Sequence, residues 1–449
     1  MSGAGSAQGE RPWAGRRIHL IGVGGAGMSA YARAAYALGA EVSGSDAADG
    51  EYLRRLAADG VLQAAVGHRP DNVPAGGQVE VYHSSAVPED NVERVQARAR
   101  GLLDRSRAEL LGELSAMRRT IAVGGTHGKT TTAAMIARML LAAGMRPGWL
   151  IGAPIGAGLA NAEWGEGEWL VVEADESDRS MLSLRPEIAV LINVELDHHA
   201  SFASLEELRG VFRSFLAGAP QAVVWDRPEV LALREGPVVA FDVREVQLTE
   251  GGSRFRWGEH EVELSVPGLH NALDATAALE ATRLAGAPAE QALGGLAAFE
   301  GAGRRFQAIG RSAGGARLYE DYAHHPTEVA ATLSAARTLR PSRLVAVFQP
   351  HLFSRTKLLA REFGVALALA DVIVVLDVYP ARERAEEFPG VSGLLIAEAA
   401  ADAAGGRPVY WLPGFEAAWT VLAALLRDGD VCVVMGAGDV DRLGRELVS

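Results

Sequence analysis

Residues 120–132, Thr-Ile-Ala-Val-Gly-Gly-Thr-His-Gly-Lys-Thr-Thr-Thr, predict a strand that runs through a glycine-rich turn into a helix. The first four residues are a short, largely apolar run, which is typical of a buried strand. Three glycines then let the backbone bend tightly, at Gly124, Gly125 and Gly128. A helix-like segment follows at 133–143. This order of elements favours an α/β fold built around a phosphate-binding loop.

The chemistry of this turn suits a nucleoside triphosphate. Free N–H groups at the start of a helix and the helix dipole both attract anions. Lys129 adds a cation for the β- and γ-phosphates, and Thr130 adds a hydroxyl for Mg²⁺. The common pattern has one more glycine where this chain has Val123, so a tight turn with a solvated lysine is the alternative. The strand-to-helix context favours the nucleotide.

The composition describes a chain of several domains. With 449 residues, about three domains are expected, and 49% apolar residues are enough for sizeable cores. A net charge of −13 argues against a surface for nucleic acid or for an anionic membrane. The single cysteine, Cys432, excludes a disulfide framework within one chain. Because no apolar run has membrane-spanning length and residues 1–10 lack the apolar core of a signal peptide, we expect a soluble, cytoplasmic protein.

Short apolar runs alternate with amphipathic segments along the chain, which predicts βαβ units and mostly parallel sheets. Three blocks emerge, separated near residue 105 and by the glycine-rich segment 300–303. A hairpin at 255–257 and 262–266 predicts a β element inserted in the second block. The principal strands are expected at 17–23, 41–43, 79–83, 120–123, 169–172, 188–192, 317–320, 344–348, 372–376, 409–411 and 431–435, with helices at 28–38, 133–143 and 272–284.

A second glycine-rich turn follows the first expected strand. Gly22, Gly24 and Gly27 open a helix, and Asp46 ends the next strand about twenty residues later. This spacing outlines a dinucleotide-binding turn. A bound NAD, a UDP-sugar and a packing turn without a ligand all agree with so short a motif.

Two strands of the second block end in polar groups. The strand at 169–172 is followed by four carboxylates, which beside a phosphate loop can hold Mg²⁺: Glu173, Asp175, Glu176 and Asp178. Glu173 is the first choice because it is nearest the strand end, and Asp178 is the one best explained as solvated.

The strand at 188–192 is followed by further candidate ligands, namely Asn193, Glu195, Asp197, His198 and His199. We expect a metal or phosphate role for the two histidines. A zinc site is not expected there, because the neighbouring residues supply oxygen more than sulfur or several imidazoles.

Later segments carry further candidates. Asn271 suits either adenine recognition or the N-cap of the helix at 272–284. Arg304 and Arg305 are either a solvated pair or place an arginine over the γ-phosphate.

Two loops of the third block, 321–326 and 349–355, fall where open α/β sheets bind ligands. Arg355 in the second loop suits a carboxylate.

In this order, the motifs resemble those of the Mur ligases, over almost the whole chain from 22 to 438. The strings that carry the resemblance are Gly-Val-Gly-Gly-Ala-Gly-Met-Ser (22–29), Gly-Thr-His-Gly-Lys-Thr-Thr-Thr (125–132), Val-Glu-Ala-Asp-Glu-Ser-Asp (172–178), Asp-Tyr-Ala-His-His-Pro-Thr-Glu (321–328), Phe-Gln-Pro-His (348–351) with Ser-Arg-Thr (354–356), and Met-Gly-Ala-Gly-Asp (435–439).

The resemblance implies three α/β domains: a Rossmann-like domain at 1–105 for a UDP-sugar, a central P-loop ATPase-like domain at 106–308, and a Rossmann-like domain at 309–449 for an amino acid. It also implies ATP-dependent, Mg²⁺-dependent amide ligation in peptidoglycan precursor synthesis. The lactyl carboxylate of UDP-N-acetylmuramate would become an acyl phosphate, which the amine of L-alanine attacks. The enzyme would be a monomer or homodimer.

The family's functional positions can be carried onto this sequence. The catalytic positions are Lys129, His198 and Arg305, and the metal positions are Thr130, Glu173 and His198. The ATP positions are Gly125, Thr126, Gly128, Lys129, Thr130, Thr131, Asn271, Arg305 and Asp321. The positions for the UDP-sugar and the amino acid are Gly24, Gly25, Gly27, Asp46, Ser84, Ser85, His199, His351 and Arg355, with His199 also considered as the base for the amine.

Three positions depart from the family pattern. Leu352 stands where many relatives have a basic residue, which gives Arg355 a larger part in carboxylate binding. Asp274 replaces the second asparagine of His-Asn-x-x-Asn, and when it is ionised it can only accept hydrogen bonds, which puts its family role in doubt. Ala200 replaces a frequent polar residue.

Three alternative functions stand beside this interpretation. They are a tripeptide-recycling ligase of the same family, an NAD(P)-dependent oxidoreductase and a non-catalytic nucleotide-binding regulator. The segment 348–356 favours the L-alanine reaction over the first, and the phosphate loop argues against the second.

Overall fold

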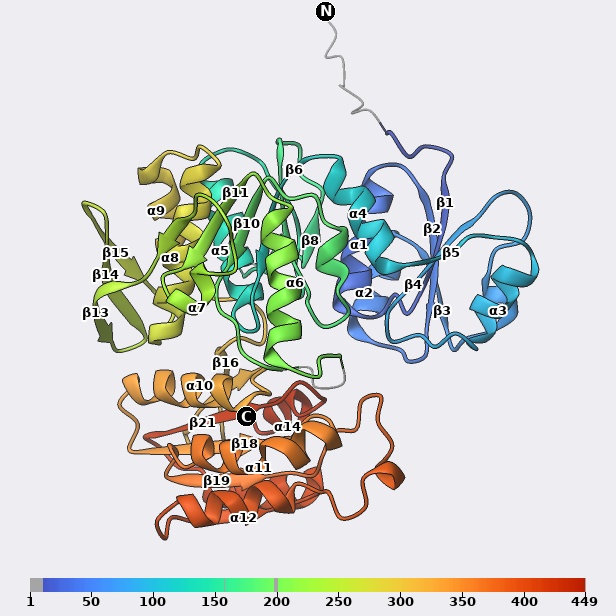
Figure 1. The fold of residues 1–449 in the computed structure, drawn as a ribbon. Helices are drawn as coiled ribbons and strands as arrows, with labels where there is room; N and C mark the ends of the chain where they lie inside the picture. Colours follow the sequence, from blue (N-terminus) through green and yellow to red (C-terminus); the bar gives the residue numbers. More distant parts are fainter. Residues whose placement is uncertain (1–10, 157, 198–200, 449) are drawn as a thin grey trace, which may run out of the picture.

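A computed structural model describes residues 11–156, 158–197 and 201–448, which form three α/β domains (Figure 1). The first domain has a parallel five-stranded sheet in the order β3-β2-β1-β4-β5. Its elements are β1 Arg17–Ile21, α1 Ala26–Ala37, β2 Glu41–Asp46, α2 Glu51–Ala58, β3 Gln63–Val66, β4 Glu80–His83, α3 Val92–Ala99, β5 Asp104–Ser106 and α4 Arg107–Ala116. The strand order reverses between β1 and β4, which is where such sheets bind ligands.

The central domain contains a seven-stranded sheet in the order β12-β11-β10-β6-β9-β7-β8, parallel except for the pairing of β7 with β8. Its elements are β6 Arg119–Gly124, α5 Lys129–Ala142, β7 Gly148–Leu150, β8 Ala162–Glu163, β9 Trp169–Glu173, β10 Ile188–Leu191, α6 Leu205–Ala217, β11 Gln221–Trp225, α7 Pro228–Leu231, β12 Val239–Phe241, α8 Leu269–Leu284 and α9 Ala289–Ala297. The inserted element is an antiparallel three-stranded sheet of β13 Arg244–Thr249, β14 Gly252–Trp257 and β15 His260–Leu264.

The third domain lies below the central one in Figure 1 and has a six-stranded sheet in the order β16-β17-β21-β18-β19-β20. Only β16 is antiparallel to its neighbour. The elements are β16 Gln307–Arg311, β17 Arg317–Asp321, α10 Pro326–Thr338, β18 Arg343–Phe348, α11 Phe353–Leu367, β19 Val372–Val375, α12 Leu394–Ala403, β20 Val409–Trp411, α13 Phe415–Leu425, β21 Asp430–Met435 and α14 Asp441–Glu446.

The central sheet is buried on both faces, because helices cover both sides. Val123 and Val171 pack in the core that contains α5 and α8, whereas Ala122 and Val172 pack in the core that contains α6. Alternate residues of one strand therefore meet different helices, and both sets must be apolar. This explains the continuous apolar runs.

The α/β prediction is confirmed, with local differences. Helix α5 begins at Lys129 rather than at 133, and the expected hairpin has a third strand, β13. The divisions at 105/106 and 308/309 stay predictions; β5 ends at Ser106 and β16 begins at Gln307.

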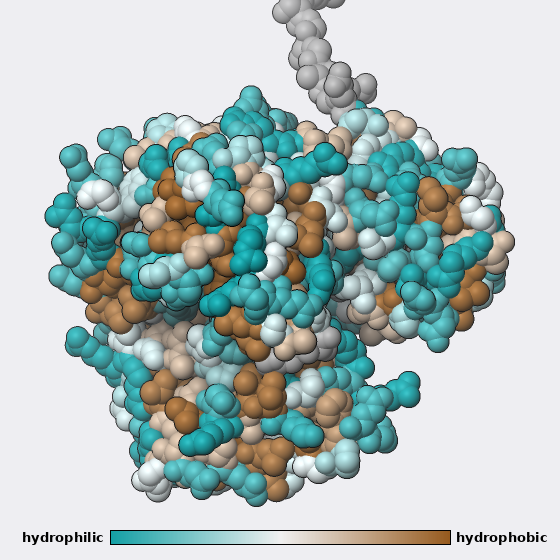
Figure 2. Space-filling view, viewed as in Figure 1, coloured by the Kyte–Doolittle hydropathy of each residue, from teal (hydrophilic) through white to brown (hydrophobic). Residues whose placement is uncertain are grey.

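The visible face carries apolar residues in small groups separated by hydrophilic ones (Figure 2). Among the described residues, no helix is both long enough and apolar enough to cross a membrane.

Candidate active site

A cleft of about 1470 Å³ lies where the three domains meet. It brings together predicted residues from all three: Gly24, Gly27, Thr126, Gly128, Lys129, Thr130, Glu173, Arg305, His351 and Arg355. Each follows the carboxyl end of a parallel strand or opens the next helix, except Arg305, which lies in the linker before β16. The fold therefore places the glycine-rich turn of the first domain, the Lys129 loop of the central domain and Arg355 of the third domain around one cleft.

The phosphate loop between β6 and α5 needs glycine at two positions. Gly125 has φ +140°, and a Cβ atom there would lie 2.5 Å from Ile192 Cγ1. Gly128 has φ +82° as the N-cap of α5, and its Cβ atom would lie 2.7 Å from Asp274 Oδ1. The backbone of this loop is thus in close contact with its surroundings, in a conformation that a side chain would disrupt.

Lys129 opens α5 and its ammonium group turns back over the loop. Nζ donates to the carbonyls of Gly125 at 2.6 Å and Thr126 at 3.1 Å, and it contacts Glu176 at 2.8 Å. Burial lowers the pKa of Lys129, but Glu176 and then Asp175 outweigh burial, and the net shift is upward. The lysine therefore stays charged at neutral pH, as phosphate binding requires.

Oxygen ligands for a hard cation lie beside this lysine. Glu173 ends β9, accepts a hydrogen bond from the Gly152 amide and contacts the Thr130 hydroxyl. Burial raises the pKa of Glu173, whereas Gly152, Lys129 and other neighbours lower it, with a net upward shift. A hydroxyl and a carboxylate side by side are ligands that Mg²⁺ prefers.

Two other predicted site residues, His198 and His199, lie outside the described residues, as does Ala200. Thr131 is buried in α5, and the Thr126 hydroxyl donates to the Glu195 carbonyl at 2.9 Å.

Asp178 is not solvated, contrary to the sequence interpretation. Arg107, at the start of α4, contacts Asp178 through Nε at 2.5 Å and Asp175 through Nη2 at 2.7 Å. Glu176 is fully buried against Lys129. Asp175 and Asp178 therefore connect the loop after β9 to α4, and Glu176 connects it to the phosphate loop, roles that spacing along the chain does not reveal.

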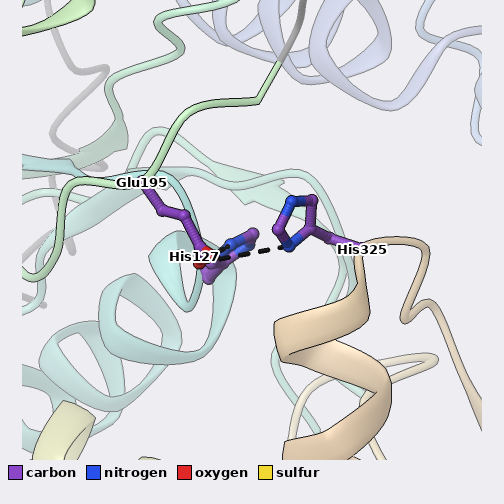
Figure 3. Close-up of side chains that lie close together, drawn as sticks. All are labelled: His127, Glu195 and His325. Carbon is purple, nitrogen blue, oxygen red and sulfur yellow. Dashed lines mark hydrogen bonds and ion pairs between the residues drawn. The ribbon is translucent and has the colours of Figure 1, made fainter. Parts of the chain in front are cut away.

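His127 in the phosphate loop was not singled out from the sequence, yet it lies between two carboxylates. Its Nε2 lies 3.0 Å from Glu195 Oε2 (Figure 3). Its Nδ1 lies 3.3 Å from Glu328 Oε1. Burial lowers the pKa of His127, but Glu195 and Glu328 outweigh burial and raise the pKa to about 9. The Asn193 side chain fixes the His127 backbone through two hydrogen bonds of 2.9 Å.

Asn271 does not cap α8. Gly268 is the N-cap, and Asn271 Nδ2 donates to the Pro267 carbonyl at 2.6 Å. Burial raises the pKa of Asp274, one turn later, to about 8, despite the opposing charge of Arg305. At neutral pH this carboxyl group is therefore protonated. It can donate a hydrogen bond, as the asparagine of the family pattern can.

The two linker arginines point to different partners. Arg304 donates to the carbonyls of Gly436 at 2.9 Å and Gly438 at 3.2 Å, so it is not simply solvated. Arg305 lines the cleft, with Nη1 3.9 Å from Glu328 Oε1. Asp321 accepts from the Phe306 amide at 2.7 Å, and burial raises its pKa to about 6. Asp321 thus fixes the linker next to Arg305.

Arg355 at the start of α11 is almost fully buried. Its Nη2 and Nε donate to Asp197 Oδ1 at 2.9 and 3.2 Å, which joins the third domain to the central one. Its Nη1 lies 3.2 Å from His351 Nδ1. Burial lowers the pKa of His351 to about 3, with further contributions from His324 and Arg355. A neutral imidazole and a guanidinium therefore share the third-domain side of the cleft.

In the first domain, the Gly24 amide donates to Asp46 Oδ2 at 2.9 Å, and Gly25 is the N-cap of α1. A Cβ atom at Gly22 would lie 2.9 Å from Ser84 Cβ, so Ser84 adjoins this turn, whereas Ser85 is exposed. Gly27 adjoins Arg107. The ligand roles of these residues stay predictions.

Three family models match the chain in the order of its domains. They are described as "Mur ligase family, catalytic domain" for residues 17–119, "Mur ligase middle domain" for 123–282, and "Mur ligase, glutamate ligase domain" for 304–438. Together these matches span most of the chain.

Similar proteins agree with these models. A UDP-N-acetylmuramate–L-alanine ligase of Mycolicibacterium smegmatis is 42% identical over 97% of this chain and 95% of its own length. One of Nocardia farcinica is 40% identical over 96% and 94%. The crystal structure of UDP-N-acetylmuramate-alanine ligase MurC from Thermotoga maritima has a TM-score of 0.83 at 26% identity, covering 96% of this chain and 98% of that one.

Proposed function

The chain belongs to the Mur ligase family, and we propose that it joins L-alanine to the lactyl carboxylate of UDP-N-acetylmuramate with conversion of ATP to ADP and phosphate. The observation that carries this proposal is the convergence of Gly24, Lys129 and Arg355 on one cleft. Each comes from a different domain, which suits a reaction with three substrates.

The central loop fits ATP and Mg²⁺. The close packing at Gly125 and Gly128 leaves backbone N–H groups, rather than side chains, for phosphate oxygens. Thr130 and Glu173 supply oxygen ligands for Mg²⁺, and His198 stays the predicted third ligand. When bound, Mg²⁺ neutralises charge on the phosphates. Lys129 supplies a further positive charge beside them.

The chemistry proceeds in two transfers. An oxygen of the lactyl carboxylate attacks the γ-phosphorus while the bond to the ADP oxygen breaks, which gives an acyl phosphate and ADP. The amine nitrogen of L-alanine, after losing a proton, attacks the acyl carbon; the bond to the phosphate oxygen then breaks and the amide remains. Arg305 lines the cleft and offers charge to the phosphoryl group, and His199 stays the predicted base.

The third domain recognises the amino acid in this proposal. Arg355 suits its carboxylate, because a guanidinium has five N–H donors, and those on Nη1 face the His351 side while Nε and Nη2 donate to Asp197. His351 is neutral and contacts the same guanidinium. The short side chain of L-alanine needs little space beyond these groups.

A coupled assay of ADP release tests the proposal. We expect release that requires both UDP-N-acetylmuramate and L-alanine, with weaker turnover for glycine or L-serine. Turnover with the cell-wall tripeptide instead of L-alanine would support the recycling ligase, and nicotinamide reduction without ATP turnover would support an oxidoreductase. Either result would overturn the proposal.

A further inference from the structure

Three potential metal ligands from three separate segments meet beside the phosphate loop. His127 comes from that loop, Glu195 from the loop after β10, and His325 from the N-cap of α10 (Figure 3). One ligand atom from each lies within 4.8 Å of the other two. We propose that these residues bind a divalent cation of the Zn²⁺ type, separately from the Mg²⁺ expected at Thr130 and Glu173. This proposal does not depend on the ligase assignment.

The distances suit a tetrahedral ion with small adjustments. With metal–ligand bonds of about 2.0–2.1 Å, neighbouring ligand atoms in a tetrahedral site lie about 3.3–3.4 Å apart. Glu195 Oε2 lies 3.0 Å from His127 Nε2 and 4.0 Å from His325 Nδ1. His325 is buried, so both separations are adjusted by rotation of the Glu195 side chain, whose 42% exposure also leaves a route from solvent.

The surrounding hydrogen bonds orient these ligands. His127 Nδ1 lies 3.3 Å from Glu328 Oε1, and the Thr327 hydroxyl donates to Glu195 Oε1 at 2.8 Å. A carboxylate that accepts from the distal nitrogen of a ligating histidine is a frequent feature of metal sites. Here it would place the Nε2 lone pair of His127 toward Glu195 Oε2, away from Glu328.

The ligand set indicates the class of metal. Two imidazoles and one carboxylate favour Zn²⁺ and similar ions, whereas Mg²⁺ prefers oxygen alone. From the sequence, zinc was not expected after β10, because oxygen donors predominate there. The fold adds one imidazole from the phosphate loop and one from the third domain.

A proton is the competing occupant. When it is protonated, His127 lies as an imidazolium between Glu195 and Glu328. A metal ion must replace the proton on His127 Nε2, and that proton passes to solvent or buffer. His325 contributes from the third domain, so the bound ion would connect α10 directly to the phosphate loop.

Metal binding by the full chain tests the site. Zn²⁺ affinity and stoichiometry are measured against a chromophoric chelator in excess Mg²⁺, with visible absorption of Co²⁺ as a second readout. We expect one tightly bound Zn²⁺ per chain and a tetrahedral Co²⁺ spectrum. In Glu195→Gln and His325→Ala, Zn²⁺ affinity should fall at least about tenfold and the spectrum should be lost.

Two further variants complete the test. His260→Ala removes an exposed histidine of β15 and should leave Zn²⁺ binding unchanged. Thr327→Val removes only the hydroxyl that donates to Glu195 and should weaken Zn²⁺ binding by about tenfold. This variant tests the site if His325→Ala does not fold. The absence of Zn²⁺ binding in wild type, or undiminished binding in folded Glu195→Gln and Thr327→Val, would overturn the proposal.

Discussion

Replacing Lys129 should reduce stability as well as catalysis, because the lysine contacts a fully buried carboxylate. Its Nζ lies 2.8 and 3.1 Å from the two oxygens of Glu176. Removing one member of a buried ion pair costs about 3–5 kcal/mol. We expect the lower end, about 3 kcal/mol, for Lys129→Met, because 14% of the lysine side chain is exposed and water can approach. For a domain of this size, the melting temperature should fall by about 6–12 °C.

A second substitution separates stability from catalysis. In Lys129→Met/Glu176→Gln, the buried negative charge of Glu176 is also removed. The melting temperature should therefore recover most of the fall seen in Lys129→Met, whereas ADP release should be abolished in both variants. Calorimetric melting at pH 7 and the coupled assay measure the two effects.

The pH dependence of this effect follows from the raised pKa of Lys129. The pair stabilises the fold fully below the lysine's ordinary pKa of 10.5 and loses that contribution as the pH rises further. Equal melting temperatures for Lys129→Met and wild type, or no recovery in the double variant, would refute the reasoning.

Three other substitutions test different parts of the cleft. Arg355→Lys keeps the charge but loses the planar donors that contact Asp197, so the KM for L-alanine should rise at least about tenfold in the ADP assay. Gly125→Ala places a Cβ atom 2.5 Å from Ile192 Cγ1 at φ +140°, and calorimetry should detect no binding of an ATP analogue. As the pH rises from about 4 to 8, wild type should lose more stability than Asp274→Asn, because burial raises the pKa of Asp274 to about 8 and its ionisation then opposes folding.

Matched variants control these tests. Arg361 is exposed on the same helix as Arg355, and Arg361→Lys should leave the KM unchanged. Gly144 also has a positive φ, +72°, but no atom lies within 4 Å of its Cβ position, so Gly144→Ala should cost about 1 kcal/mol and retain nucleotide binding. A normal KM in Arg355→Lys, analogue binding by Gly125→Ala, or a wild-type pH profile in Asp274→Asn would each contradict the corresponding argument.

Strands with two buried faces could be predicted from the sequence, and polar strands could not. β6, β9 and β10 are apolar throughout because helices cover both faces of the sheet. β5, with the sequence Asp-Arg-Ser, and β16, with Gln-Ala-Ile-Gly-Arg, carry no such signal and form because a neighbouring strand offers backbone hydrogen bonds. Helix α5 starts earlier than expected because packing overrides the weak helix propensity of its threonines.

Individual site residues were predictable where they end a strand, whereas their partners were not. Lys129 follows β6 and Glu173 is the last residue of β9, so their proximity follows from a parallel sheet. The pairing of Arg355 with Asp197 joins residues 158 positions apart in different domains. No local pattern encodes such a contact. For the same reason, the contact between His127 and Glu328 could not be predicted from the sequence.

The first turn of α10 has a consequence for how ligands influence one another. Glu328 contacts His127 of the phosphate loop through Oε1 and His324 beside the third-domain cleft through Oε2. A shift of α10 must therefore disturb both contacts together. If binding of nucleotide or amino acid moves α10, the two binding events are coupled, and the factor by which one ligand changes the affinity for the other is then the same in both directions.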